Sequence, residues 1–339
     1  MQGLKWWRSV LLAVCLLIFA TSVYAQRYAF SFLDIPANTK LGALGGVNVS
    51  SGGDVNQFLS NPALLDDSLA TYASFNYINF PGDISLSQVT YAHQISGFTV
   101  GFGLQYMDYG EIESFDDTGF PLGVQDAREY AFTVGLSKSQ GVFDYGINTK
   151  LISARYADAV AIGLAFDIGL LFQHPEYDLV GAINIRNIGF MLKDFTEIAN
   201  SELPLDVVMG ASFKPEYMPI RFSLTARNLG RQEATYFDPS RQNNLASTAP
   251  SFGAQVMNRL IFGAEVLLSE NFHLRGGYNH LVRRELLIEQ AGGGSGFSFG
   301  LMFRVKSFEF AYTRALYHTA GSANLFSIST QMKRFWTHN

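Results

Sequence analysis

The sequence predicts an all-β protein, a transmembrane antiparallel β-barrel of about 14 strands with an N-terminal segment that plugs its lumen. Three observations predict this fold. First, apolar residues alternate with small or polar residues along many segments. Second, most of these segments have the 9 to 11 residues that a tilted strand needs to cross a bilayer. Third, the connections between the segments alternate between short and long. The expected parts are a signal peptide (1–25), a plug (26–68) and the barrel (69–336).

The first 25 residues have the features of a secretory signal peptide. Lys5 and Arg8 give a positive start, residues 10–20 are apolar, and Ala25 offers a small residue before a cleavage site. The apolar core is shorter than the roughly 20 residues of a spanning helix. Cleavage would remove Cys15, the single cysteine, and would change the formal charge from −5 to −7. The exported chain then has no thiol ligand, and its acidity disfavours nucleic-acid binding.

A glycine-rich stretch, LGGVNVSSGGDVNQFLSNPALL (44–65), precedes the first expected strand. Glycine-rich loops can bind phosphate, but this one lacks the lysine of a P-loop and the glycine spacing of a dinucleotide site. Its glycines permit tight turns, and a proline restricts the chain before a new element. We therefore expect a plug near the periplasmic mouth, which either seals the lumen or moves to open it. The candidate plug residues are Asp54, Phe58, Asn61, Pro62 and Leu64.

The barrel is expected from segments such as AVAIGLAFDIGL (159–170), in which large apolar residues alternate with Ala, Gly and Asp. Fourteen candidate segments follow one another, an even number, as in single-chain bacterial barrels. They are 69–79, 85–94, 98–108, 128–138, 143–155, 159–172, 177–187, 205–215, 220–229, 258–268, 271–280, 296–304, 307–316 and 324–335.

The connections give an independent indication of a barrel. The tight ones are 95–97, 139–142, 173–176, 216–219, 269–270 and 306, and the intervening ones include 109–127, 188–204, 230–257 and 281–295. If both termini are periplasmic, every long connection faces outward. A soluble β-sandwich also has alternating strands, so the period alone leaves that alternative open. The alternation of connection lengths favours the outer-membrane barrel, with its long loops facing outside the cell.

Charged candidates lie on the small or polar face of the expected strands or in the loops. Asp167, Arg221, Arg227 and Arg304 are expected to face the lumen, where charges shielded from lipid can pair and hold a plug. Arg283 and Arg284 lie in an expected outer loop and are candidates for contact with an anionic lipid or a partner protein.

The residues do not form the arrangements expected of an enzyme. No two histidines have metal-ligand spacing, and the one Gly-x-Ser-x-Gly match (296–300) lies within an alternating strand instead of at a sharp turn. Asp116 and Asp117 are expected in a solvated outer turn, with a calcium site as the alternative. We therefore expect no catalytic residue, no metal and no cofactor.

An ordered series of segments carries a family resemblance. LDIPANTKLGALGGVNVSSGGDVNQFLSNPALL (33–65) resembles the N-terminal segment of barrels related to the long-chain fatty-acid transporter. Together with SFNYINFPGDISLSQVTYAH (74–93), GFGLQYMDYGEI (101–112), FGAEVLLSENFHLRGGYNHLVRRELL (262–287) and FSFGLMFRVKSFEFAYTRALYHTAGSANLFSIST (297–330), it is similar to the PorQ family of the type IX secretion system in Bacteroidetes.

This resemblance implies a non-enzymatic outer-membrane barrel that anchors PorZ in a cell-surface complex with PorU and PorV. Such a complex removes the sorting domain of exported cargo and joins the cargo to anionic lipopolysaccharide, so outer-membrane lipid is a further expected partner. The long outer connections would form the docking face. The wider relationship to the fatty-acid transporter implies an alternative, transport of a hydrophobic small molecule, which requires an apolar pocket in the lumen.

Overall fold

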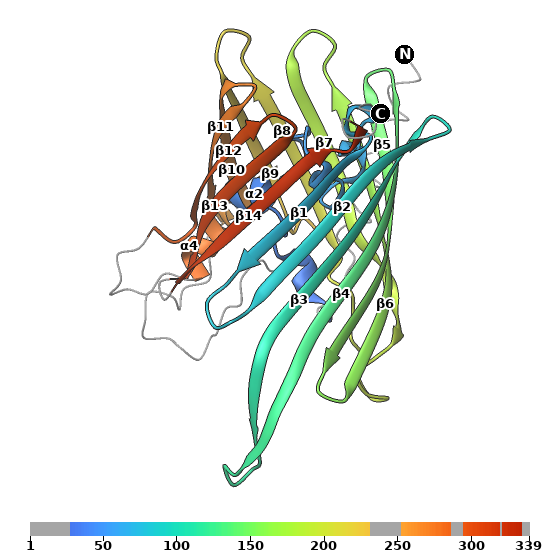
Figure 1. The fold of residues 1–339 in the computed structure, drawn as a ribbon, viewed down its shortest axis with the longest axis vertical. Helices are drawn as coiled ribbons and strands as arrows, with labels where there is room; N and C mark the ends of the chain where they lie inside the picture. The colour runs from blue at the N-terminus through green and yellow to red at the C-terminus, as the bar shows by residue number, and fades with distance from the viewer. Residues whose placement is uncertain (1–27, 231–251, 286–293, 319–320, 334–339) are drawn as a thin grey trace.

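The chain folds into one closed barrel. A computed structural model describes residues 28–230, 252–285, 294–318 and 321–333, so the expected signal peptide (1–25) lies outside the described residues. Fourteen antiparallel strands pair with their neighbours in chain order, and β1 (Tyr72–Asn79) closes the barrel against β14 (Gly321–Gln331), with Tyr72 opposite Gln331 (Figure 1). The predicted fold class, an all-β transmembrane barrel of about 14 strands, is confirmed.

The remaining strands lie within a few residues of most predicted segments. They are β2 (Ser85–Ile95), β3 (Phe98–Phe115), β4 (Pro121–Gln140), β5 (Phe143–Tyr156), β6 (Ala159–Gln173), β7 (Asp178–Lys193), β8 (Asp206–Lys214), β9 (Ile220–Ala226), β10 (Leu260–Ser269), β11 (Phe272–Asn279), β12 (Phe297–Val305) and β13 (Phe308–His318).

The strands have the inside-out distribution of a membrane barrel. On β6, Ala161, Ala165 and Asp167 are fully buried toward the lumen, whereas Ile168 and Leu170 are 51% and 42% exposed on the outer surface. The same alternation recurs around the barrel and leaves an apolar belt facing outward. Among the described residues, no helix has the length and apolar character needed to cross a membrane.

The two rims differ in the lengths of their connections. Residues 96–97, 141–142, 174–177, 215–219, 270–271 and 306–307 form short turns at the rim where β1 begins and β14 ends, which is the upper rim in Figure 1. We call this the periplasmic rim and the opposite one the outer rim. At the outer rim the β3–β4 hairpin extends well beyond the other strands (Figure 1).

Several predicted outer loops contain regular structure. Most of 109–127 is strand, β7 continues to Lys193, and the helices α3 (Phe252–Arg259) and α4 (His280–Glu285) overlap the predicted loops 230–257 and 281–295 and take in residues 258, 259 and 280, which were predicted as strand. Residues 231–251 and 286–293 of those loops lie outside the described residues. Beyond the bilayer, strands no longer need an apolar outward face, so alternation is lost while backbone pairing continues.

The N-terminal segment lies inside the barrel and consists of short helical turns. They are η1 (Ser31–Asp34), α2 (Thr39–Ala43), η2 (Val55–Leu59), η3 (Pro62–Leu64) and η4 (Asp67–Leu69). Most of their side chains are buried against the inner wall. We refer to residues 28–69 as the plug.

Candidate functional site

The plug runs through the lumen from one rim to the other. At its start, the Ala29 amide donates to the carbonyl oxygen of Glu202, in the outer connection between β7 and β8. At its end, the Thr71 amide donates to the carbonyl oxygen of Ala92, near the periplasmic end of β2. The stretch 44–65 was expected near the periplasmic mouth, and its residues 55–65 occupy that half of the lumen, whereas the earlier residues Phe30 and Phe32 fill the outer half.

Short polar side chains explain why the plug folds into single turns. The Asn38, Asp54 and Asn61 side chains accept hydrogen bonds from the backbone amides of Leu41, Asn56 and Ala63, so that each caps the start of a turn. Pro62 then occupies the first position of η3, where no amide hydrogen is needed. These caps let the chain turn repeatedly without leaving backbone donors unpaired.

Glycines on the inner wall bring the plug backbone close to the strands. A Cβ atom at Gly146 would lie 2.6 Å from the carbonyl carbon of Pro62, and one at Gly277 would lie 2.2 Å from the amide nitrogen of Gly45. Phe58 and Leu59 pack against further inward-facing glycines on β3 and β4 in the same way. The inner wall is therefore complementary to the plug, because a larger residue at any of these glycine positions would displace the plug.

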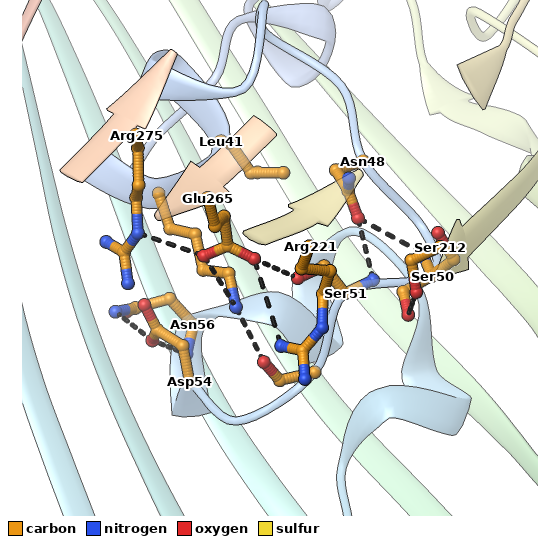
Figure 2. Close-up of polar contacts among 12 residues, drawn as sticks. Leu41, Asn48, Ser50, Ser51, Asp54, Asn56, Ser212, Arg221, Glu265 and Arg275 are labelled. Carbon is orange, nitrogen blue, oxygen red and sulfur yellow. Dashed lines mark hydrogen bonds and ion pairs between the residues drawn. The ribbon is translucent and has the colours of Figure 1, made fainter. Parts of the chain in front are cut away.

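One buried charge cluster joins the plug to β10 and β11. Lys40 Nζ lies 3.7 Å from Glu265 Oε1 and donates to the Gly52 carbonyl oxygen at 2.6 Å. Arg275 Nε donates to Glu265 Oε1 at 3.1 Å, and Ser51 Oγ donates to Oε2 at 2.6 Å (Figure 2). The Glu265 carboxylate therefore holds two separate stretches of the plug.

A second buried cluster lies on β5 to β8. Lys150 Nζ lies 2.8 Å from Asp167 Oδ2, and Arg186 Nη2 lies 3.0 Å from Asp206 Oδ2. The same Arg186 nitrogen reaches Asp34 Oδ1 of η1 at 3.1 Å. Arg186 thus ties the outer half of the plug to the wall, as Glu265 ties its middle.

Between the two clusters, buried amides hold the turns η2 and η3. Asn56 Oδ1 accepts hydrogen bonds from Asn76 Nδ2, Gln88 Nε2 and Thr90 Oγ1 at 2.8, 2.9 and 2.7 Å. Asn148 Nδ2 donates to the Phe58 carbonyl oxygen at 2.8 Å. These contacts satisfy backbone and side-chain groups that would otherwise be costly to bury.

The structure places the predicted plug residues in the lumen. Phe58, Asn61, Pro62 and Leu64 are buried there, and Asp54 caps η2. Asn61 Nδ2 also donates to the Val49 carbonyl oxygen at 2.9 Å. Their assignment to a seal or a gate stays a prediction.

The predicted lumenal charges divide between the clusters and the rims. Asp167 belongs to the second cluster, and Arg221 lies 3.3 Å from Asp178 and 4.0 Å from Glu265. Arg227 lies 3.8 Å from Asp34, near the outer rim, whereas Arg304 pairs with Glu309 at 2.8 Å near the periplasmic rim. The outer-loop candidates Arg283 and Arg284 form the last turn of α4 and are half-buried.

Sequence reasoning missed the residues that carry most of the contacts: Lys40, Glu265, Arg275, Lys150, Arg186 and Asn56. A usable signal existed for Glu265 and Lys150, because each occupies the small or polar face of its alternating strand. Lys40 and Asn56 gave no such signal, since the plug has no periodic pattern. Ser298, the middle residue of the Gly-x-Ser-x-Gly match, donates to the Ala43 carbonyl oxygen at 2.9 Å and so holds α2.

Among the cavities that the described residues form between plug and wall, two exceed the space of about 10 Å³ beside Gly42 and Gly45. The larger, about 260 Å³, is at the periplasmic rim and is lined in part by Asp66, Asp144, Asp178 and Arg221. The smaller, about 30 Å³, lies beside Lys150. Neither is an apolar pocket of the several hundred Å³ that a small-molecule ligand usually occupies. In the described parts of the chain, no group of three or more His, Cys, Asp or Glu side chains is arranged to hold a metal ion.

Comparison with known proteins gives solved structures of the same fold. No family model matches the chain, and no curated protein matches it either. The Pseudomonas putida toluene transporter TodX is 12% identical, with 90% of this chain and 98% of that chain covered and a TM-score of 0.54. The Ralstonia pickettii toluene transporter TbuX is also 12% identical, with coverages of 89% and 100% and a TM-score of 0.54.

A third similar structure is the CymD monoaromatic hydrocarbon channel, which is 12% identical, with coverages of 89% and 98% and a TM-score of 0.55. At this identity the likeness shows the fold and not the cargo. With the closed wall, the apolar belt and the polar lumen, it identifies the chain as a fourteen-stranded β-barrel of the bacterial outer membrane, with an N-terminal segment preceding the barrel.

Proposed function

We propose that this outer-membrane barrel is a non-enzymatic anchor, whose rigid wall and plug hold a partner protein at the cell surface. The observation that carries the proposal is that ion pairs and close packing hold the plug in the lumen. Glu265 of β10 holds its middle and Arg186 of β7 its outer half, and wall glycines fit its backbone. An anchor benefits from a rigid body, whereas a conduit has to break these contacts.

The energetics of the two clusters support a plug that stays in place. Separating a buried charge from its partner costs about 3–5 kcal/mol. Withdrawing the plug would separate Lys40 from Glu265 and Asp34 from Arg186. Two such losses are comparable with the roughly 5–15 kcal/mol that keep a whole domain folded. A resting barrel is therefore expected to remain closed.

The proposed partner is PorZ, within a complex that also contains PorU and PorV, as the family resemblance implies. The longer connections that gather at the outer rim support this proposal, because loops on a rigid scaffold commonly carry binding. Arg283 and Arg284 of α4 lie at the same rim, where their charge suits the phosphates of lipopolysaccharide. In this proposal the barrel holds the complex and other members cut and transfer the cargo.

Affinity purification from intact outer membranes tests the anchor. We expect a tagged barrel to copurify PorZ, PorU and PorV, and we expect PorZ to leave the surface of cells that lack the barrel. An unrelated outer-membrane barrel with the same tag is the control. PorZ that stays on cells lacking the barrel, and that does not copurify with it, would contradict the proposal.

Transport of a hydrophobic small molecule is the second candidate, and the comparisons favour it. The three solved structures are described as toluene transporters or as a monoaromatic hydrocarbon channel. Transport here would require the plug to rearrange, since the two lumenal cavities described above are small or bordered by charge. Uptake of labelled toluene that depends on this chain, with PorZ retention unchanged in its absence, would establish transport in place of anchoring.

A further inference from the structure

The β3–β4 hairpin has backbone edges that no neighbouring strand covers. The last residue of β3 that pairs with β2 is Asp108, and the first residue of β4 that pairs with β5 is Ala127. Beyond these positions, the strand residues of 109–115 and 121–126 pair with each other, and one backbone contact to a neighbour remains, from the Ala157 amide to the Asp126 carbonyl oxygen at 3.0 Å. A strand edge exposes a row of backbone donors and acceptors that can bind another strand. Each strand of the hairpin therefore offers an unpaired edge, and in the described part of the chain β7 offers another beyond Arg186, where β8 no longer pairs with it.

The hairpin projects far enough to be reached from outside the membrane. At about 3.3 Å per residue, the seven residues 109–115 add roughly 23 Å to the strand. Figure 1 shows the hairpin extending past the other connections of the outer rim. A register shift between Asp108 and Glu111 lies at its base, where Gly110 has a φ of +74° and its amide donates to Asp108 Oδ1 at 3.0 Å. Such a bulge redirects a strand as it leaves a barrel.

The tip of the hairpin is ordered by its own hydrogen bonds. Asp116 Oδ1 accepts from the amides of Thr118 and Phe120 at 2.9 and 2.8 Å and from Thr118 Oγ1 at 2.7 Å. The hydroxyl and amide donors lower the pKa of Asp116, which keeps its carboxylate charged. A hairpin that is already ordered loses less conformational entropy when a partner binds.

Its side chains combine exposed apolar groups with negative charge. Ile112, Phe115, Phe120 and Val124 are between 47% and 69% exposed. Residues 109–127 include five acidic residues and no Lys or Arg: Glu111, Glu113, Asp116, Asp117 and Asp126. The nearest cation, Arg128, lies 3.2 Å from Asp126 at the base of the hairpin.

We propose that the free edge of this hairpin binds an extended, basic segment of the partner protein, which adds to it as a further strand. Main-chain hydrogen bonds then supply affinity, while exposed apolar and acidic side chains select the sequence. The charge of the hairpin disfavours the alternatives at this position, since a second copy of the chain and anionic lipopolysaccharide would both be repelled. The inference rests on the proposed anchoring function and names the surface that performs it.

Two variants of the full-length barrel test the surface, with retention of PorZ on cells as the readout. The first removes residues 111–126 and joins the strands by an Asn-Gly turn, and the second is Glu111→Lys/Glu113→Lys. We expect each to lower PorZ retention at least tenfold. The matched control is Asp158→Lys/Glu197→Lys, which reverses two exposed charges elsewhere on the same rim. Wild-type levels of folded barrel, seen as heat-modifiable migration on gels, are required of all variants.

Amide hydrogen exchange separates strand addition from simple side-chain contact. In the purified complex, amides on one edge of residues 109–115 or 121–126 should exchange at least tenfold more slowly than in the barrel alone. PorZ retention that survives either variant, or exchange that is unchanged in the complex, overturns the hairpin assignment. If cells lacking the barrel keep PorZ on their surface, the anchoring function itself fails, which is a different outcome from failure of the hairpin alone.

Discussion

Lys40 of the plug lies 3.7 Å from Glu265 of the barrel wall, and both side chains are more than nine-tenths buried. The two residues are 225 positions apart in the chain, yet the carboxylate also binds Arg275 and Ser51. A single wall residue therefore fixes the position of the plug relative to the C-terminal half of the barrel.

Substituting Glu265 should destabilise the barrel more than substituting Lys40. Glu265→Gln leaves Lys40 and Arg275 buried without a counter-charge, so we expect a loss of about 3–5 kcal/mol in the free energy of unfolding. Lys40→Met leaves the carboxylate paired with Arg275, and we expect a loss of about 1.5–3 kcal/mol. Urea-induced unfolding in detergent micelles measures both. Glu270→Gln, in an exposed periplasmic turn, should change stability by no more than about 0.5 kcal/mol; equal losses for Glu265 and Glu270 would contradict this ranking.

A methyl group at Gly146 should push the plug away from β5. The added Cβ would meet the Pro62 backbone at 2.6 Å, and overpacking of this kind costs about 1–3 kcal/mol. Gly181→Ala is the matched control, because a Cβ there meets nothing within 4 Å. We expect higher ion conductance in planar bilayers for Gly146→Ala than for Gly181→Ala. Identical conductance and stability of the two variants would show that the plug can shift without cost.

Among the buried side-chain amides of the lumen, Asn56 should be the one whose substitution lowers stability most. Asn56→Leu removes the acceptor of three hydrogen bonds and leaves the donors of Asn76, Gln88 and Thr90 buried. Each unsatisfied donor costs about 1–3 kcal/mol, so the thermal unfolding midpoint should fall by several degrees. Asn79→Leu, at an exposed end of β1, is the control and should leave the midpoint unchanged. A wild-type midpoint for Asn56→Leu would mean that other groups replace the lost acceptor.

The outer connection between β7 and β8 should loosen in acid. Burial raises the pKa of Asp194, but hydrogen bonds from the amides of Ser201 and Phe195 outweigh this and lower it below the ordinary 3.8. Because the pKa is lowered, the stabilisation of the loop by the ionised Asp194 carboxylate is complete above pH 3.8. It is lost as the pH falls through the pKa of the folded state. Cleavage of this loop by pepsin should therefore increase more steeply on acidification in the wild type than in Asp194→Asn. Parallel profiles for the two proteins would exclude Asp194 as the cause.

Most of the fold was predictable, because the bilayer imposes one rule on every strand. Ile168 must face lipid and Asp167 must not, so alternation marks each spanning segment. The β3–β4 hairpin escaped prediction because residues 109–127 are solvated, where that rule no longer applies. The start of β14 at Gly321, three residues before the predicted one, has the same cause.

The plug was predictable as a feature but not in its contacts. Glycines and Asn61-Pro62 before the first strand indicated a turn-rich segment, and the caps at Asp54 and Asn61 fit that expectation. The partner of Lys40 could not be inferred, since the wall offers many inward positions and the plug has no period to fix its register. Glu265 and Arg275 are partners across the β10–β11 hairpin, which follows from its short turn, but nothing local in the sequence records that Lys40 joins them.

The attachment of α2 to the last strands has a consequence for biogenesis. Thr313 Oγ1 donates to the Thr39 carbonyl oxygen, and Ser298 Oγ to that of Ala43, across separations of 274 and 255 residues. The helix α2 therefore finds this binding surface only when β12 and β13 arrive. Because β1 must also wait for β14, sealing the wall and seating α2 become a single late event. A chain stalled before β12 would leave the assembly machinery with an open sheet and an unseated α2, a state that proteases can recognise.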